Sequence, residues 1–399
     1  MSDTTARVTE AAGEPVPAIA GIPAASAPPP APARERPPLG VVGPIAWART
    51  NLFSGWLSTA VTLALGYLVL RWALSFVDWA FVHAIWTVPN TAAGTPDPAA
   101  CRDAKGVGAC WAVIGEKYRF ILFGRYPYDS QWRPAIVVVL FIGLFVVSAM
   151  RRFWRKELIL LWVGTLTVIG ALMWGGVLGL EFVPQDSWGG LPITLILATF
   201  GLALAFPLSV LVALGRRSTQ MPAVKAICVI YVELIRGVPL ITLLFMASVM
   251  FPLFMPEGLN PDKLLRAQVA FILFAAAYLA EVVRGGLQAL PKGQYEAADA
   301  LGLSYWRKTG LIILPQALRL VIPPLVNTFI GFFKDTSLVL IIGIFDLLTA
   351  GKVAIAEPIW QAYSTEVYIV LALVYFAFCF TMAKYSRGLE TDFSRATRR

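Results

Sequence analysis

Long apolar runs separated by short polar or basic stretches dominate this chain. They predict about eight membrane-spanning helices, near residues 52–70, 135–150, 158–178, 191–214, 238–254, 267–280, 320–344 and 367–382. Most of these runs approach the roughly 20 residues that a helix needs to cross the hydrocarbon core of a bilayer. The pattern therefore predicts an all-α, polytopic membrane protein.

The charges between the apolar runs predict the orientation of the spans. Basic residues cluster after the second run and at the end of the fourth: Arg151, Arg152, Arg155, Lys156, Arg216 and Arg217. Lys and Arg are enriched in cytoplasmic loops. The loop after the third run contains Glu181 and Asp186 but no basic residue, which favours the opposite side. Eight spans with both termini in the cytoplasm satisfy these clusters.

The two ends of the chain differ in composition from the apolar runs. Residues 1–45 are rich in Ala and Pro and show no hydrophobic periodicity, which predicts a disordered cytoplasmic tail. Residues 387–399 are basic and predict a second cytoplasmic tail. Between them, residues 46–185 form an N-terminal extension with three spans, whose long loop at 78–133 is expected on the periplasmic side.

Composition agrees with a membrane protein. The chain of 399 residues is 58% hydrophobic and only 14% charged, against roughly 25% charged residues in soluble domains. The formal net charge is +9, but the basic residues lie in short clusters between apolar runs. That placement follows the positive-inside rule, so we expect no nucleic-acid partner.

The four cysteines are of two kinds. Cys228 and Cys379 lie in apolar segments and are expected to be unreactive thiols. Cys101 and Cys110 share the polar loop at 78–133. If that loop is periplasmic, a disulfide between them is favoured, with two free thiols as the alternative.

One polar piece, from Gln294 to Gln316, interrupts the apolar second half of the chain. It predicts a short helix over 295–301 and a glycine turn at Gly302, where a left-handed residue is least costly. A second short helix over 305–313 follows, with Ser304 able to cap it. Leu314 and Pro315 are expected to end it, because proline cannot continue the backbone hydrogen bonds.

The same piece resembles a known family. It matches, at the right spacings, the EAA loop of the integral membrane subunits of bacterial ABC importers, in Glu296, Ala297, Ala298, Gly302, Ile312, Leu314 and Pro315. The flanking segments AEVVRGGLQALPKGQ and PQALRLVIPPLVNTFIGFFKDTSL resemble the branch that imports histidine, glutamine or general L-amino acids. The resemblance extends over roughly residues 191–384.

The resemblance implies a function and a set of partners. Residues 186–386 would be a five-helix, type I ABC importer permease core with a cytoplasmic coupling loop at about 290–316. The core would pair with a second, homologous permease subunit, two ATPase subunits and a periplasmic amino-acid-binding protein. It would move polar or general L-amino acids across the bacterial inner membrane by alternating access.

The chain itself shows no nucleotide-binding motif that could drive such transport. It contains no G-x-x-x-x-G-K-[ST] sequence, so it cannot bind ATP phosphates as P-loop proteins do. ATP and Mg²⁺ are therefore expected in the partner ATPase, and no cofactor, metal or catalytic residue is expected in this chain. The family's coupling loop docks on the ATPase, and Glu296 would meet basic groups there.

Charged and hydroxyl residues within the seventh apolar run form the second candidate site: Lys334, Asp335, Thr336, Ser337 and Leu338. Ionisable groups inside a membrane span are costly and are functional by default. Asp335 suits the ammonium of an amino acid, and the hydroxyls of Thr336 and Ser337 suit its carboxylate. A role in substrate binding or gating is favoured over a structural ion pair.

Three further charges are interpreted as structural. Glu233 and Arg236 stand three residues apart on one predicted helix and can pair. Arg284 follows the sixth run, and all three are expected to brace the cytoplasmic ends of helices.

Two other functions were weighed against an ABC importer. The first is an ATP-independent channel or ion-coupled amino acid carrier, which would transport without an ATPase. The second is an intramembrane enzyme, which is disfavoured because His83 is the chain's single histidine and metal ligands do not cluster.

Overall fold

The computed structural model describes residues 43–91, 94–177, 179–256, 258 and 261–397. Within this part of the chain, seven helices are long and apolar enough to cross a membrane, and a bent helix pair makes an eighth span if it is counted as one. The all-α, polytopic fold is thus confirmed. The tail expected at 1–45 lies outside the described residues up to position 42, and helix α1 (Pro44–Asn51) already begins within it.

The chain divides into two compact units, Met1–Ser75 and Phe76–Arg399. The first unit contains α1 and most of α2 (Trp56–Val77). The hydroxyls of Ser58 and Thr62 both donate to the carbonyl of Leu52, which fixes the turn between the two helices. No residue of α2 is buried, and its large apolar side chains face outward on every side, as is typical of a helix in lipid.

The first part of the second unit holds the loop at 78–133. It is structured rather than extended, with η1 (Asp78–Val82), α3 (Ala99–Asp103), α4 (Ala112–Phe123) and η2 (Tyr128–Ser130). Cys101 and Cys110 are joined by a disulfide within it. The backbone N–H of Cys110 donates to Glu366 at 2.9 Å, and Lys117 pairs with Glu357 at 2.6 Å, so the loop is attached to the C-terminal part of the chain.

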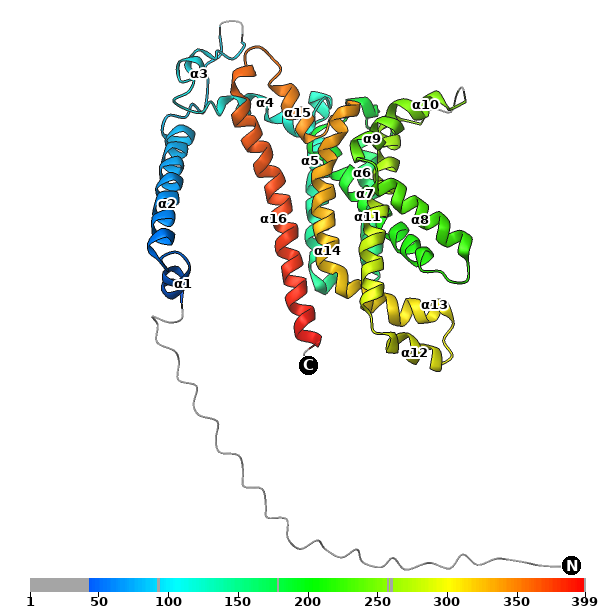
Figure 1. Ribbon diagram of the computed structural model, residues 1–399. Coiled ribbons are helices and arrows are strands. Elements are labelled where there is room, and N and C mark those ends of the chain that lie inside the picture. Colours follow the sequence, from blue (N-terminus) through cyan, green and yellow to red (C-terminus); the bar gives the residue numbers. More distant parts are fainter. Residues whose placement is uncertain (1–42, 92–93, 178, 257, 259–260, 398–399) are drawn as a thin grey trace, which may run out of the picture. The chain divides into compact units, whose positions relative to one another are not determined.

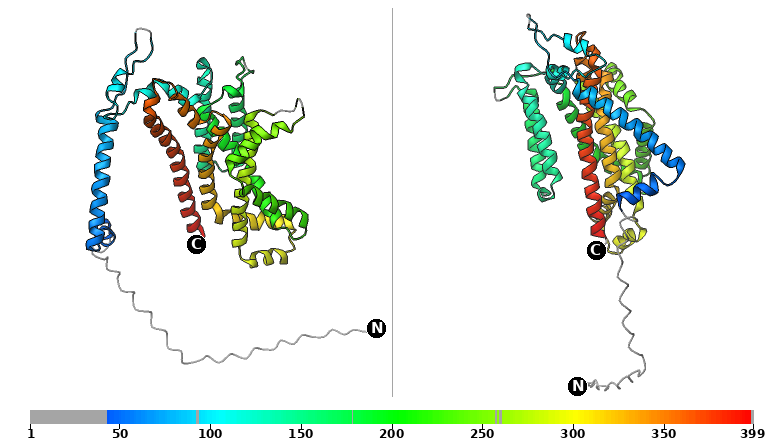
Figure 2. Two further views of the ribbon diagram at one scale, coloured as in Figure 1. Left: turned by 45° about the horizontal axis from the view of Figure 1, so that its top comes forward. Right: turned by 90° about the vertical axis from the view of Figure 1, so that its left-hand side faces the viewer.

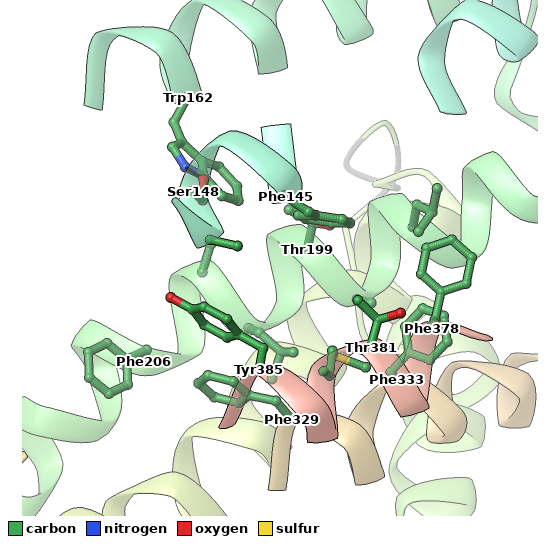
Figure 3. Close-up of a pocket in the computed structure, with 16 residues that line it drawn as sticks. Phe145, Ser148, Trp162, Thr199, Phe206, Phe329, Phe333, Phe378, Thr381 and Tyr385 are labelled. Atoms are coloured by element: carbon green, nitrogen blue, oxygen red, sulfur yellow. Dashed lines mark hydrogen bonds between the residues drawn. The ribbon is translucent and has the colours of Figure 1, made fainter. Parts of the chain in front are cut away.

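Two helices follow as an antiparallel hairpin, α5 (Trp132–Ala149) and α6 (Glu157–Trp174), joined through η3 (Arg151–Phe153). Arg133 is buried and donates to the carbonyls of Leu172 and Glu181, which holds the start of α5 to the end of α6. Farther along the hairpin, an apolar cavity separates α5 and α6 from the helices behind them (Figure 3).

The remaining long helices form the bundle beside which the hairpin stands (Figure 1). They are α7 (Gly190–Arg216), α11 (Lys263–Ala289), α14 (Leu314–Asp335) and α16 (Ser364–Thr397). α11 is the central member, because its alanines at 275–277 and 280 are fully buried and let its neighbours approach closely. α16 continues to Thr397, so the C-terminal tail expected at 387–399 begins as part of this helix.

The fifth expected span, 238–254, corresponds to a helical run from Leu240 to Leu253 that begins after a sharp break in the chain. α8 (Pro222–Arg236) is followed, after a break, by α9 (Leu240–Phe245), η5 (Met246–Met250) and α10 (Phe251–Leu253), and the two parts are bent by 102°. The run from Leu240 to Leu253 is about 21 Å long at 1.5 Å per residue, shorter than a bilayer core. Gly237 and Pro239 explain the break, since proline cannot continue the helix.

Short elements connect the long helices at the two ends of the bundle (Figure 2). They are η4 (Gln185–Ser187), α12 (Lys292–Ala300), α13 (Tyr305–Lys308), η6 (Thr309–Ile313), η7 (Thr336–Ile342), α15 (Leu347–Ala354) and η8 (Gln361–Tyr363). α12 and α13 lie at one end, whereas α15 and α4 lie at the other (Figure 1).

The crossing of α11 and α14 predicts opposite effects for two neighbouring glycines. A Cβ on Gly286 would lie 2.6 Å from Val321 Cγ1 and 2.7 Å from the carbonyl oxygen of Ala317, whereas a Cβ on Gly285 meets nothing within 4 Å. Gly286→Ala should therefore lower the free energy of unfolding by about 1–3 kcal/mol. The control Gly285→Ala should leave it unchanged or raise it by up to about 1 kcal/mol. Thermal unfolding in one detergent measures both, and equal shifts would contradict this packing.

Candidate functional site: a loop tied to three helices

The element that projects beyond the bundle is the α12–α13 loop, residues 292–313 (Figure 1). Gly302 has φ +68°, in the left-handed region that favours glycine, and its N–H donates to the carbonyl of Asp299. The chain reverses there, and α13 returns beside α12. Lys308 pairs with Asp299 at 2.5 Å, which holds the two short helices together.

The local structure of this loop differs from expectation in three places. α12 begins at Lys292 rather than at residue 295, and α13 ends at Lys308 before the π-helix η6. Ser304 occupies the N-cap position but makes no side-chain capping bond. Leu314 and Pro315 begin α14 instead of ending the preceding helix, because proline suits a first helical turn, where no N–H partner is needed.

The outer surface of the loop combines apolar and charged groups. Leu301, Trp306 and Leu311 are 74%, 67% and 73% exposed. Of the residues expected to couple to an ATPase, Glu296, Ala297, Gly302 and Pro315 are exposed, Leu314 is half-buried and Ala298 is buried against the loop itself. Exposed apolar side chains gathered beyond the membrane-spanning part of a bundle are typical of a protein-docking surface.

Tyr295 attaches the loop to the bundle. Its hydroxyl donates to the carbonyl of Leu287 on α11 at 2.8 Å. Arg217, the residue that ends α7, donates from one nitrogen to both the Leu287 carbonyl and the Tyr295 oxygen, each at 2.8 Å. Gln294 accepts a bond of 3.0 Å from Gln316 on α14. These bonds attach α12 to the ends of three long helices.

Tyr295 and Arg217 were not singled out from the sequence. Tyr295 stands next to the Glu296 motif, and Arg217 was counted only as a basic residue that ends the fourth span. Nothing in the local sequence shows that these two side chains meet, because they are 78 positions apart.

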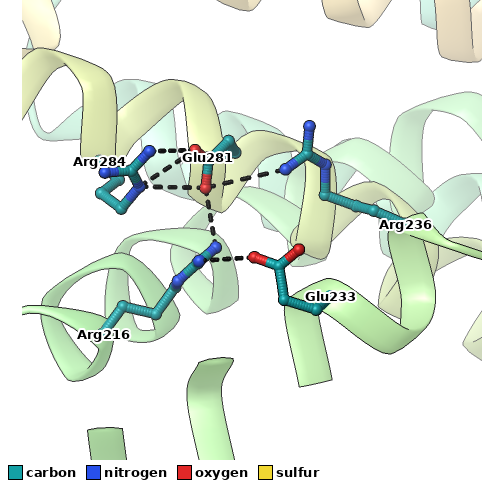
Figure 4. A network of polar contacts seen from close by, with 5 residues as sticks. All are labelled: Arg216, Glu233, Arg236, Glu281 and Arg284. Atoms are coloured by element: carbon teal, nitrogen blue, oxygen red, sulfur yellow. Dashed lines mark hydrogen bonds and ion pairs between the residues drawn. The ribbon is translucent and has the colours of Figure 1, made fainter. Parts of the chain in front are cut away.

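A group of five charged residues lies nearby and links α7, α8 and α11 (Figure 4). Glu281 is at its centre and accepts from Arg284, from Arg216 at 2.8 Å and, more distantly, from Arg236 at 3.9 Å. Arg216 also bonds Glu233 at 2.8 Å. These contacts brace the same ends of the helices to which the α12–α13 loop is attached.

The expected pair between Glu233 and Arg236 is not among these contacts. Each of the two reaches a different helix instead: Glu233 bonds Arg216 on α7, and Arg236 faces Glu281 on α11. The side chain of Glu281 is 24% exposed and that of Glu233 is 61% exposed. Charge attraction is screened less at the more buried carboxylate, so Glu281 collects three arginines.

The second candidate site lies at the far end of α14. Its 22 residues rise about 33 Å, so Asp335 is nearer the end opposite the α12–α13 loop than the middle of the span. The hydroxyls of Thr336 and Ser337 donate to the carbonyls of Phe333 and Lys334, one turn back. Within the described residues, Asp335 forms no ion pair with Lys334; the first is half-buried and the second exposed.

The backbone after Asp335 is unusual. Thr336–Ile342, which includes Leu338, is a 3₁₀-helix of seven residues, and Gly343 ends it with φ +72°. Runs of 3₁₀-helix longer than three or four residues are uncommon, and within a longer helix they often mark a hinge. Lys334 and Asp335 thus precede, and Thr336 and Ser337 begin, a segment whose backbone hydrogen bonds are weaker than those of an α-helix.

Asp346, which was not among the candidate residues in the sequence, lies close to this segment. It is buried and caps α15, accepting from the backbone N–H groups of Thr349 at 3.0 Å and Leu348 at 3.1 Å. Tyr375 donates to its second oxygen at 3.4 Å. Burial raises the pKa of Asp346, and these hydrogen bonds oppose that rise. The sequence does contain a signal for this capping role, because Asp346 stands directly before the first residues of an apolar helix.

No group of three or more His, Cys, Asp or Glu side chains placed to hold a metal ion occurs in the described part of the chain. Cys228 and Cys379 are unbonded and half-buried.

Comparison with known proteins adds to this geometry. Residues 205–390 match the family described as "Binding-protein-dependent transport system inner membrane component". The chain is 50% identical over 356 residues to the inner membrane amino-acid ABC transporter permease protein YhdY of Escherichia coli (strain K12), covering 87% of this chain and 92% of that protein.

A second relative is the glutamate/glutamine/aspartate/asparagine transport system permease protein BztC of Rhodobacter capsulatus. It is 38% identical over 419 residues, covering 90% of this chain and 95% of that protein. Among solved structures, a crystal structure of an amino acid ABC transporter with histidines is similar at 30% identity and a TM-score of 0.45, covering 51% of this chain and 92% of the other.

Proposed function

This chain belongs to the binding-protein-dependent transport system inner membrane components, as a permease subunit of an amino-acid ABC importer, and from that premise we propose how its parts act. It is a multi-pass protein of the bacterial inner membrane that moves polar or general L-amino acids. The similarity along nearly the whole chain favours this function over an ATP-independent channel or ion-coupled carrier.

The first proposal concerns the source of energy. The α12–α13 loop docks on a separate ATPase subunit, which binds ATP and Mg²⁺ and hydrolyses the nucleotide. The exposed Leu301, Trp306 and Leu311 would supply apolar contact area, and the exposed carboxylate of Glu296 would meet basic groups of the ATPase. This chain would bind no nucleotide or metal and would catalyse nothing itself.

The second proposal concerns transmission. When two ATPase subunits close on ATP, the loop moves with them, and the bonds of Tyr295 to Leu287 and Arg217 carry that movement to α11 and α7. The charge group centred on Glu281 keeps α7, α8 and α11 together as they tilt. Alternating access is then a shift of population between two packings of the helices.

The third proposal concerns partners and orientation. A second, homologous permease subunit would complete the pathway, and a periplasmic binding protein would deliver the amino acid. The α12–α13 loop and both termini would lie in the cytoplasm and the disulfide-bonded loop at 78–133 in the periplasm, an orientation that the positions of the basic clusters support. The three spans within residues 46–185 would be an extension of the core at 186–386.

The fourth proposal concerns the substrate. An amino acid carries an ammonium group and a carboxylate group. The carboxylate of Asp335 would accept hydrogen bonds from the ammonium group, and Thr336, Ser337 or nearby backbone N–H groups would donate hydrogen bonds to the carboxylate group. Lys334 would balance the charge. The name of the Rhodobacter relative suggests acidic amino acids and their amides. The long 3₁₀-helix after Asp335 would act as the gate that moves during transport.

Charge reversal on the loop tests the docking. Glu296→Lys should reduce both co-purification of the ATPase and amino acid uptake by about tenfold or more, the loss that corresponds to roughly 1.4 kcal/mol of binding energy. Glu296 is exposed, so insertion of the protein in the membrane should not change. The control Lys225→Glu reverses an exposed charge on α8 and should have little effect. Normal uptake and co-purification in Glu296→Lys would remove the loop from the ATPase interface.

Neutralisation of Asp335 tests the substrate site separately. Asp335→Asn keeps the shape of the side chain but removes the charge that would meet the ammonium, so uptake should fall by about tenfold or more. Co-purification of the ATPase should stay at the level of the unmodified protein, because the loop lies at the other end of α14. Uptake with unaltered rate and unaltered choice among amino acids would show that Asp335 does not contact the substrate.

A further inference from the structure

The cavity between the α5–α6 hairpin and the bundle has a volume of about 560 Å³ (Figure 3). Five helices supply its walls: α5, α6, α7, α14 and α16. The large side chains that line it are mainly aromatic, namely Phe145, Trp162, Phe206, Phe329, Phe333 and Phe378. Neither the coupling loop nor the segment around Asp335–Leu338 takes part, so transport as proposed above leaves this space without a role.

The walls contain few polar side chains, and three of them form hydrogen bonds within the walls. The indole N–H of Trp162 donates to the hydroxyl of Ser148 at 2.9 Å, and Thr381 donates to the carbonyl of Ala377 one turn back at 2.7 Å. A polar molecule in this space would lose its hydrogen bonds to water and gain few others, which is unfavourable. An apolar chain fits the lining.

A second cavity of about 340 Å³ adjoins the first. Four residues line both, namely Phe206, Phe329, Met382 and Tyr385. The second cavity is completed by apolar side chains of α14 and α16, including Leu325 and Leu389. Two apolar recesses that share one wall match a molecule with two apolar chains.

Basic residues lie at one end of the first cavity. Ser148 and Ala149 line the cavity, and the turn that follows them contains Arg152, Arg155 and Lys156, all exposed. The indole N–H of Trp154 in this turn donates to the carbonyl of Ser148 at 2.8 Å, which fixes the turn against the cavity. Arg151 is close enough to Tyr385, in the shared wall, to interact with it electrostatically. Glu157 is the one acidic residue between 148 and 162.

We propose that the two cavities bind the acyl chains of one anionic glycerophospholipid, whose phosphate group is held by the basic turn of Arg152, Arg155 and Lys156. An anionic phospholipid carries apolar acyl chains next to a negatively charged headgroup. The structure has a matching arrangement, because the apolar cavities lie next to the basic turn. Basic pockets between membrane helices on the cytoplasmic side attract anionic headgroups. With the orientation proposed above, the lipid comes from the cytoplasmic leaflet.

Lipid binding to the purified full chain tests this directly. Native mass spectrometry in mild detergent would follow the binding of added phosphatidylglycerol and of phosphatidylcholine with identical acyl chains. The unmodified protein should bind phosphatidylglycerol at least about tenfold more tightly. The triple variant R152Q/R155Q/K156Q should lose this preference and still bind phosphatidylcholine. A control triple of equally exposed basic residues, K225Q/K292Q/R307Q, should keep the preference.

Filling the cavity tests the other half of the proposal. Leu202 lines the first cavity, whereas Leu211 on the same helix is 60% exposed and lines neither. Leu202→Trp should reduce binding of both lipids several-fold, and Leu211→Trp should not.

Each of these binding results would overturn the assignment: equal binding of both lipids to the unmodified protein, unchanged binding in the R152Q/R155Q/K156Q protein, or identical behaviour of the two tryptophan variants. A photo-reactive side chain at Ala203 should attach to lipid. If it attached to helix α2 or to another permease chain, the cavity would be a helix-packing site and the proposal would fail.

Discussion

The bonds of Tyr295 to Leu287 and Arg217 are the interaction on which this account depends. The membrane helices are apolar and carry no nucleotide-binding sequence, so they have no energy source of their own. In the proposed function, movement reaches them from an ATPase outside the bilayer. The hydroxyl group of Tyr295 and the guanidinium of Arg217 would transmit it, because they join α12 to the ends of α11 and α7 over distances of 2.8 Å.

The charges around Glu281 complement that attachment. Glu281 contacts three arginines from three helices at the same end of the bundle, and these ion pairs hold the ends of α7, α8 and α11 together. At the opposite end of α14, the backbone changes from α-helix to seven residues of 3₁₀-helix. In the proposed function, the rigid helix ends beside the ATPase would transmit its movement, and the more flexible segment after Asp335 would open and close the pathway.

Much of this could be predicted from the sequence, because apolar runs and the Glu296 motif are local patterns. They gave the all-α membrane fold and the family. The sequence missed what depends on distant contacts: Arg217 meets Tyr295 across 78 positions, and Glu233 selects Arg216 over the nearer Arg236. Gly237 and Pro239 mark the break before the fifth span in the sequence, but not the angle of 102° by which the chain bends there.

In the proposed function, the permease moves only when a separate ATPase moves the α12–α13 loop. Amino acid uptake by lipid vesicles measures this most directly, with the purified chain inserted alone or together with its co-purifying ATPase and second permease, and with binding protein and ATP supplied. We expect no uptake by the chain alone and ATP-dependent uptake by the complete assembly. Accumulation of amino acid by the chain alone, without ATP, would contradict the account.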